Sequence, residues 1–170
     1  MPVGDTDYAA TWNATVLASQ GNGGGISALG IKQIDLVAEL TELEANFNGI
    51  LAKLDADSGV TDTDYAATHV VDLNDTVVGS LGLGQDNVVS FLDSFVSKFN
   101  AALTQLDSDA GVTDTDYNST LAVTDVVNAS TKDRNTAVDN AGMSQGALYT
   151  LLNSIVTNVN ALNAKLDADA

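Results

Sequence analysis

Apolar residues recur at alternating spacings of four and three over three separate stretches of the chain. The first stretch carries Leu36, Leu40, Leu43, Phe47, Ile50 and Leu54, the second Val88, Leu92, Phe95, Phe99, Ala102 and Leu106, and the third Leu148, Leu152, Ile155, Val159, Leu162 and Leu166. This a/d pattern of a heptad repeat predicts helices near residues 31–57, 83–109 and 143–168. Each helix would be roughly 35 Å long and could not bury its stripe alone. We therefore expect an all-α protein in which the stripes pack as a helical bundle, within one chain or as a trimeric coiled-coil-like assembly.

An acidic phrase that ends in tyrosine occurs three times, at residues 3–8, 60–65 and 112–117, with the common pattern Val-x-Asp-Thr-Asp-Tyr. We call these segments the first, second and third acidic phrases. A second motif, Leu-Asp-x-Asp, closes each predicted helix at residues 54–57, 106–109 and 166–169. Recurrence of this kind indicates one supersecondary unit per copy. We expect three units, residues 1–58, 59–110 and 111–170, that form one continuous structural domain.

The segments between the predicted helices have mixed character. Gly59 and Gly111 stand where a left-handed residue ends a helix, and Thr61 or Thr63 and Asp62 or Asp64 can cap a new one. The residues that follow each phrase's tyrosine are expected to form a short helix, and the valine-, asparagine- and threonine-rich stretch beyond favours extended or irregular structure. The glycine-rich run at residues 21–25 lacks the lysine and hydroxyl residue of a phosphate loop, which argues against nucleotide binding.

The charge of the chain disfavours two classes of partner. The formal net charge is −17, and aspartate supplies nearly all of the acidic side chains, because only Glu39, Glu42 and Glu44 are glutamates. A chain of this charge repels the phosphate backbone of nucleic acids and anionic lipid surfaces. No apolar run approaches the length of a membrane span. We therefore expect neither nucleic acid nor membrane as a partner.

Candidate catalytic chemistry is sparse. His69 is the only histidine and there is no cysteine, so a catalytic triad or a histidine-based metal centre would depend on one side chain. We interpret His69 as a loop or small-core residue. Tyr8, Tyr65 and Tyr117 are interpreted as packing anchors, with stacking on a ligand such as a sugar as the alternative. We expect no enzymatic activity, no catalytic residue and no resident cofactor.

Calcium is the one ligand that the aspartates suggest. Asp55, Asp57, Asp62 and Asp64 fall within ten residues, a density of oxygen ligands that suits this ion. The spacing does not match an EF-hand loop, because glycine stands at the fifth position from Asp55, where that loop has aspartate or asparagine. We favour solvated helix caps and turns for these side chains, with calcium binding as the alternative.

The junction at residues 53–65, Lys-Leu-Asp-Ala-Asp-Ser-Gly-Val-Thr-Asp-Thr-Asp-Tyr, resembles a segment that recurs in virion structural proteins of tailed bacteriophages. The likeness returns at each unit junction and does not extend to the connectors. It implies a virion component without an active site, made in the host cytoplasm and assembled with other virion proteins. The specific expectation is a head decoration or head-fibre protein on the outer surface of the head, bound to the major capsid protein. A tail or neck component and a carbohydrate- or host-binding module of the virion are the alternatives.

The third predicted helix differs from the others in its surface. The first two carry charged residues outside their stripes, whereas no charged residue stands between Asp139 and Lys165. Charged residues are commonly depleted where an interface is buried. We predict that this uncharged face, which includes Asn153, Thr157 and Asn160, contacts a partner protein or a neighbouring copy.

Overall fold

The computed structural model describes residues 3–12, 33–73, 85–123 and 145–169, and the regular secondary structure within these ranges is entirely helical. Three long helices, α2 (Gln33–Ala56), α4 (Gln85–Ser108) and α7 (Gln145–Asp169), alternate with three short ones, α1 (Tyr8–Trp12), α3 (Tyr65–His69) and α5 (Tyr117–Leu121). The predicted all-α class is confirmed. The bounds predicted for the long helices differ from these by one or two residues at each end, and each acidic phrase is followed by the expected short helix.

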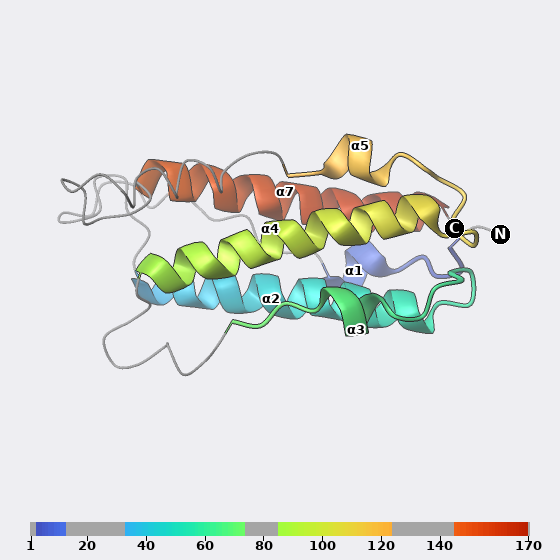
Figure 1. Cartoon of the computed structure of the whole chain (residues 1–170), viewed down its shortest axis with the longest axis horizontal. Coiled ribbons are helices and arrows are strands. Elements are labelled where there is room, and N and C mark those ends of the chain that lie inside the picture. The colour runs from blue at the N-terminus through green and yellow to red at the C-terminus, as the bar shows by residue number, and fades with distance from the viewer. Residues whose placement is uncertain (1–2, 13–32, 74–84, 124–144, 170) are drawn as a thin grey trace.

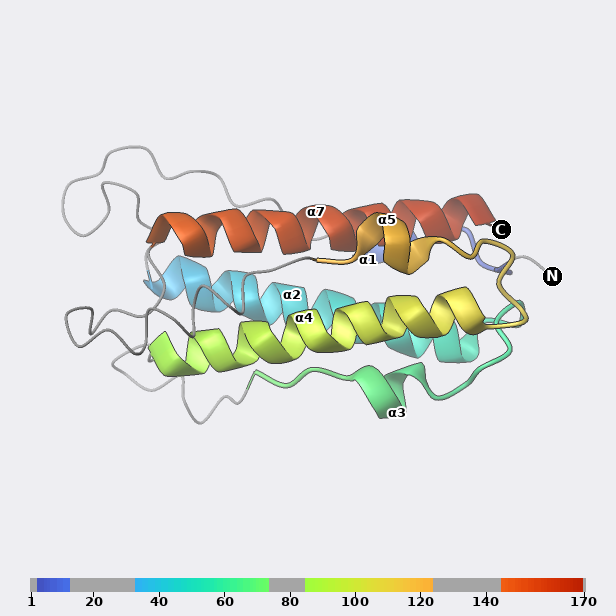
Figure 2. The ribbon, with the colours of Figure 1, turned by 45° about the horizontal axis from the view of Figure 1, so that its top comes forward.

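The long helices lie side by side and all run in the same direction (Figures 1 and 2). Their Leu-Asp-x-Asp motifs therefore gather at one end of the bundle, where the two termini of the chain also lie. Each short helix contacts two long ones: α1 contacts α7 and α2, α3 contacts α2 and α4, and α5 contacts α4 and α7. The short helices thus cover the outside of the bundle, each at the boundary between two neighbours.

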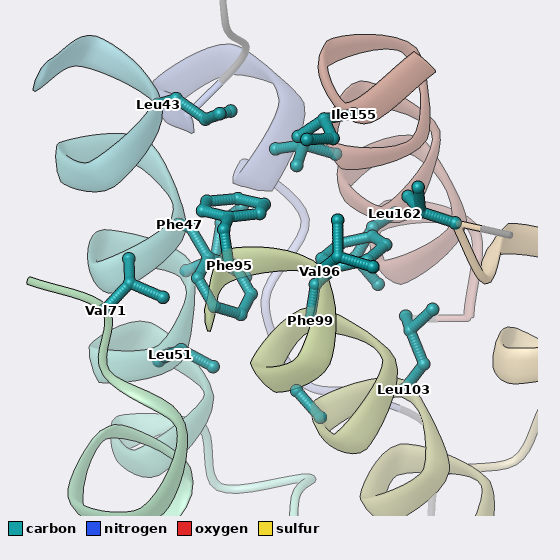
Figure 3. Close-up of a cluster of buried hydrophobic side chains, with 14 of the residues drawn as sticks. Leu43, Phe47, Leu51, Val71, Phe95, Val96, Phe99, Leu103, Ile155 and Leu162 are labelled. Carbon is teal, nitrogen blue, oxygen red and sulfur yellow. The ribbon is translucent and has the colours of Figure 1, made fainter. Parts of the chain in front are cut away.

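The core is built from the predicted stripes. Every stripe residue whose side chain is described is buried, from Leu36 on α2 to Leu166 on α7, and Leu148 falls outside the described side chains. Three aromatic rings meet near the middle of the bundle (Figure 3): the centroid of Phe47 lies 5.0 Å from that of Phe95 and 5.7 Å from that of Phe99. Burial of each such side chain contributes about 1.5–3 kcal/mol, which explains why the stripes determine the packing.

The buried face is wider than the a/d stripe, and it is not the same on each helix. Positions beside the stripe hold Phe91 and Val96 on α4 and Leu151 and Val156 on α7, all buried. The equivalent positions of α2 hold glutamates, of which Glu39 is only 8% exposed. Burial, with a smaller contribution from the neighbouring Glu42, raises the pKa of Glu39 to about 7. At Glu39, α2 therefore places a carboxyl group where the other two long helices place apolar side chains.

Two predicted details of the turns are wrong. Gly111 does not adopt the left-handed conformation, and its lack of a side chain is required by close packing: an ideal Cβ there would lie 2.1 Å from the carbonyl oxygen of Gly59. The residues before the short helices also do not cap them, because the side chains of Asp64 and Asp116 make no capping hydrogen bond. The caps of α3 and α5 come from the preceding long helix, and that of α1 comes from α7, as described below. Among the described helices, none has the length and apolar character required to cross a membrane.

Candidate functional site

The first aspartate of each Leu-Asp-x-Asp motif caps a short helix. Asp55 accepts hydrogen bonds from the backbone N–H groups of Tyr65 and Ala66, at 2.7 and 3.0 Å. Asp107 does the same for Tyr117 and Asn118, at 2.6 and 3.1 Å. A carboxylate at these N–H groups satisfies donors that a helix leaves unpaired at its start, and it interacts favourably with the helix dipole.

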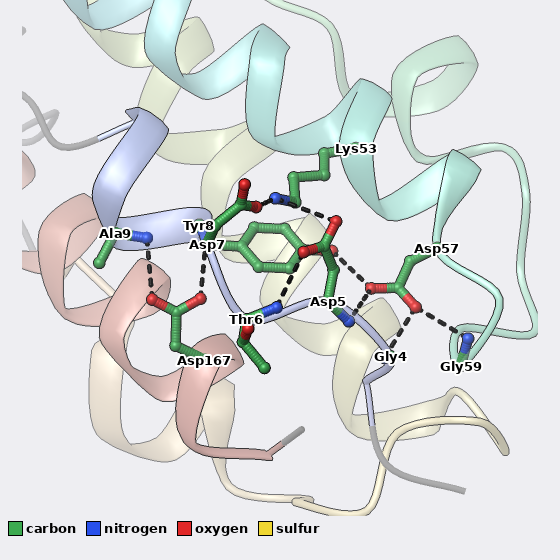
Figure 4. Close-up of polar contacts among 10 residues, drawn as sticks. All are labelled: Gly4, Asp5, Thr6, Asp7, Tyr8, Ala9, Lys53, Asp57, Gly59 and Asp167. Carbon is green, nitrogen blue, oxygen red and sulfur yellow. Dashed lines mark hydrogen bonds and ion pairs between the residues drawn. The ribbon is translucent and has the colours of Figure 1, made fainter.

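The first acidic phrase is held in the same way by a helix that is remote in sequence. Asp167 of α7 accepts hydrogen bonds from the backbone N–H groups of Tyr8 and Ala9, at 2.7 and 3.0 Å, across 159 and 158 residues of sequence (Figure 4). In the other two copies the aspartate and the tyrosine are ten residues apart. The start of the described chain therefore occupies, beside α7, the place that α3 occupies beside α2.

The second aspartate of the motif reaches across to a different acidic phrase. Asp57 accepts from the backbone N–H groups of Gly4 and Asp5 at 2.8 and 3.0 Å, from the Tyr8 hydroxyl at 3.2 Å, and from the N–H of Gly59 at 2.8 Å (Figure 4). One carboxylate thus ties α2 to a phrase that α7 caps. Each acidic phrase in this arrangement is bound to two neighbouring long helices.

Asp109 repeats this pattern on the second phrase. It accepts from the N–H groups of Thr61, Asp62 and Gly111 and from the hydroxyl of Tyr65. Burial alone would raise the pKa of Asp109, but these hydrogen bonds to its charged form outweigh burial, and the pKa lies below its ordinary value. On α7, Asp169 accepts from the N–H of Thr113 at 3.1 Å, so the third phrase is also bridged.

The tyrosines are anchors inside this region. Tyr8, Tyr65 and Tyr117 are each fully buried, which confirms the packing interpretation. Burial, together with the nearby carboxylates, raises the pKa of each phenol above its ordinary value. The hydroxyls therefore stay protonated and can donate, as those of Tyr8 and Tyr65 do to Asp57 and Asp109.

Lysine neutralises the first and third phrases. Lys53 pairs with Asp5 and Asp7 and lies over the ring of Tyr8, with its Nζ 4.5 Å from the ring centroid. Lys165 pairs with Asp114 and Asp116, and its Nζ is 4.7 Å from the centroid of the Tyr117 ring. The ammonium group thus makes an ion pair and a cation–π contact at once.

The second phrase has glutamine at the equivalent position. The Nε2 group of Gln105 donates to Asp62 at 3.1 Å and to Asp64 at 2.8 Å. Its Oε1 atom lies 2.7 Å from Nε2 of His69, so that ring nitrogen is the donor. His69 is 6% exposed, which confirms its interpretation as a small-core residue. The amide of Gln105, which is held by His69, takes the place of the lysine of the other two copies.

The four aspartates considered as calcium ligands all accept hydrogen bonds within the protein. Asp55 caps α3, Asp57 binds the first phrase, and Asp62 and Asp64 both accept from Gln105. Within the described ranges, no group of three or more acidic, histidine or cysteine side chains is arranged to hold a metal ion. Calcium binding stays a prediction, and the geometry accounts for these carboxylates through backbone and side-chain donors.

The interface candidates lie on α7, away from the acidic end. Thr157 is exposed and Asn153 is half-buried, with its side-chain oxygen buried and without a hydrogen-bond partner. Asn160 stands where α2 has Asn48 and α4 has Asn100. The amide of Asn48 exchanges two hydrogen bonds with the backbone of Val71, at 2.8 and 2.9 Å. Asn100 does the same with Val123, while the counterpart after the first phrase, Ala14, lies outside the described residues.

Sequence reasoning missed a contact between Trp12 and Gly49. A Cβ atom built on Gly49 would lie 2.3 Å from Cζ3 of Trp12, so the indole rests directly on the backbone of α2. The four-residue step from each tyrosine reaches Trp12, His69 and Leu121, and the equivalent positions of the long helices hold Gly49, Ala101 and Ala161. An alignment of the three copies with each other would have indicated this contact, because Trp12, the largest of the three side chains, is paired with Gly49, the one glycine among the three helix positions.

The contacts at the acidic end join each short helix and its acidic phrase to two long helices. Searches of protein-family models, of curated proteins and of solved structures found no match to this chain.

Proposed function

We propose that the protein is a non-enzymatic structural component of a tailed-bacteriophage particle, specifically a head decoration or head-fibre protein attached to the major capsid protein. The observation that supports this most is the use of the junction residues. The segment that resembles virion structural proteins is engaged in hydrogen bonds and packing: Asp57, Asp109 and their tyrosine partners fasten one helix to the next. Residues that fasten the helices of a scaffold to one another suit a protein whose role is to be a rigid structural part.

We further propose that the chain consists of three equivalent units arranged with internal pseudo-threefold symmetry. Two sets of contacts, each present in all three copies, support this: the caps made by Asp55, Asp107 and Asp167, and the bridges made by Asp57, Asp109 and Asp169. A homotrimer that shares helices between chains is the alternative. Light scattering at low protein concentration should give the mass of one chain, and a threefold mass would favour the homotrimer.

A carbohydrate- or host-binding module is the second candidate, and the aromatic side chains weigh against it. Tyr8, Tyr65 and Tyr117 are fully buried, so stacking on a sugar would require them to leave the core. Trp12 is half-buried and packs against the core. A glycan array separates the two proposals, because the structural role predicts no binding above background.

The location and the interface can be tested together on particles of the phage that encodes the chain. Immunogold labelling of intact particles should decorate the head, whereas labelling of the tail or neck would favour that alternative.

Asn153→Lys with Thr157→Glu should prevent incorporation while the helical circular dichroism signal is retained. Ser94→Lys with Ser97→Glu, at exposed positions of α4, is the matched control and should incorporate normally. Normal incorporation of the α7 variant would refute the assignment of this face.

A further inference from the structure

We propose that the boundary between α2 and α7 is a peptide-binding groove, and that it accepts residues 3–12 of a second copy of this chain as well as those of its own. This proposal concerns how copies join and does not depend on where the protein is located.

The side chains at the α2–α7 boundary complement the backbone and the charges of residues 3–12. It offers Asp57 and Asp167 to four backbone N–H groups of the segment, and Lys53 to its two acidic side chains. Val3 and Tyr8 are fully buried when the segment is in place. The amide of Asn163 on α7 also donates to the carbonyl oxygen of Trp12, at 3.0 Å. Backbone hydrogen bonds, charge pairs and two apolar anchors together make a complete binding site.

The first phrase differs from the other two in how it is connected to that site. The second and third phrases follow their capping aspartates by ten residues, so they stay beside their own helices. The first phrase reaches Asp167 with no such tether, and residues 13–32 join it to α2. Twenty residues can span about 65–70 Å, roughly twice the length of the bundle. The segment can therefore reach the same groove of a neighbouring molecule.

Exchange between copies would preserve every contact. The groove and the segment are the same in both molecules, so each hydrogen bond and ion pair that is lost within one chain is formed again between two. The remaining costs are the entropy of association, which falls as the protein concentration rises, and the entropy of the connecting residues, which depends on the distance that they must span. Release of residues 3–12 takes only Val3 and Tyr8 out of the core, with Trp12 beside it, whereas exchange of a long helix would expose a whole stripe.

Trp12 makes the groove selective for this phrase over the other two. The indole occupies the space above Gly49, where a Cβ atom would lie 2.3 Å from the ring. The corresponding helix positions beside the second and third phrases are Ala101 and Ala161, which cannot take an indole in the same place. The shared Val-x-Asp-Thr-Asp-Tyr pattern supplies affinity, and the Trp12–Gly49 pair directs the first phrase to the α2–α7 groove.

A disulfide test exploits the absence of cysteine from the chain. A Cβ built on Gly4 lies 3.2 Å from Oγ of Ser58, within reach of disulfide geometry. It also lies 2.9 Å from Oδ1 of Asp57, so that side chain must shift slightly, and threonine occupies the place of Gly4 in the other two phrases. The single variants Gly4→Cys and Ser58→Cys are unfolded together, refolded at high concentration and oxidised. We expect an interchain product whose peptide map joins residues 4 and 58. The double variant should form the same bond within one chain.

Two controls make the result decisive. An equivalent mixture of Thr61→Cys and Ala110→Cys, the corresponding positions of the second phrase, should give no interchain product. Adding Trp12→Leu to the Gly4→Cys chain should lower the interchain yield by about tenfold or more. The proposal is overturned if the mixture yields no bond between residues 4 and 58 of different chains, or if the unmodified protein refolded at millimolar concentration stays entirely monomeric by light scattering.

Discussion

Replacement of Gly49 by alanine should destabilise the protein, although the same change normally stabilises a helix. Alanine is favoured over glycine in a helix interior by about 0.8–1 kcal/mol. At this position, however, the new methyl group would lie 2.3 Å from Cζ3 of Trp12 and 2.5 Å from Cε3 and Cη2. Forcing a packed side chain to move typically costs about 1–3 kcal/mol. We expect a net loss of about 0.5–2 kcal/mol in the free energy of unfolding.

The sign of the effect should reverse when the indole is removed. Trp12→Leu leaves the side chain that the third copy has at Leu121, opposite alanine at the equivalent position of α7. In this background Gly49→Ala should stabilise by about 0.5–1 kcal/mol, because only the helix propensity remains. Urea denaturation of the four proteins, followed by circular dichroism, gives the coupling energy of the cycle. Stabilisation by Gly49→Ala in the unmodified protein would refute the contact.

Three further changes test the acidic end and the core. Asp109→Ala should lower the free energy of unfolding by about 2–5 kcal/mol, because it leaves several partly buried donors unpaired. This loss should exceed that of Asp169→Ala, and chemical denaturation measures both. Since the pKa of Asp109 is below its ordinary 3.8, this difference should shrink as the pH falls through the folded value, and a constant difference would contradict the assignment. The pKa of Glu39 is raised in the folded protein, so the unfolded chain releases this proton at lower pH. The free energy of unfolding should therefore fall by about 1–2 kcal/mol as the pH rises from 4.5 to about 7. Glu39→Leu should remove this pH dependence, as measured by thermal melts at fixed ionic strength. Leu43→Ala, Phe95→Ala and Ile155→Ala, which share one mid-stripe position, should each cost about 2–5 kcal/mol, and a negligible loss at one of them would show that its helix is not packed in the isolated protein.

The long helices could be predicted because a heptad stripe is a local signal. Residues four and three apart fall on one face whatever lies elsewhere in the chain, so Leu36 to Leu54 define α2 without reference to its neighbours. The parallel arrangement could not be derived in this way. It depends on the connectors running back along the bundle, and Asn48 shows one contact that holds them there, through the backbone of Val71. The valine and asparagine content of a connector does not predict that its backbone pairs with an asparagine of the long helix.

The helix caps show why local rules fail at the acidic end. Asp62 and Asp64 precede a short helix and look like its caps, but Asp55 takes that role because α2 ends close to the start of α3. For the first phrase the capping side chain is Asp167, which no local window could connect to Tyr8. The recurrence of the phrases was a correct signal that these residues work together. Which carboxylate meets which backbone is a property of the closed bundle.

The concentration of aspartate at one end follows from these pairings. Each copy brings four aspartates to this end, two from the helix and two from the phrase, and such a density would ordinarily destabilise a folded chain by repulsion. Backbone N–H groups take up the helix aspartates, while lysine or glutamine bridges those of the phrases. A carboxylate with several donors is the preferred partner at a helix start and in a tight turn, so the acidity of the chain is used in folding. The same carboxylates are then engaged within the molecule, so our proposal for a protein partner rests on the uncharged face of α7 and not on the acidic end.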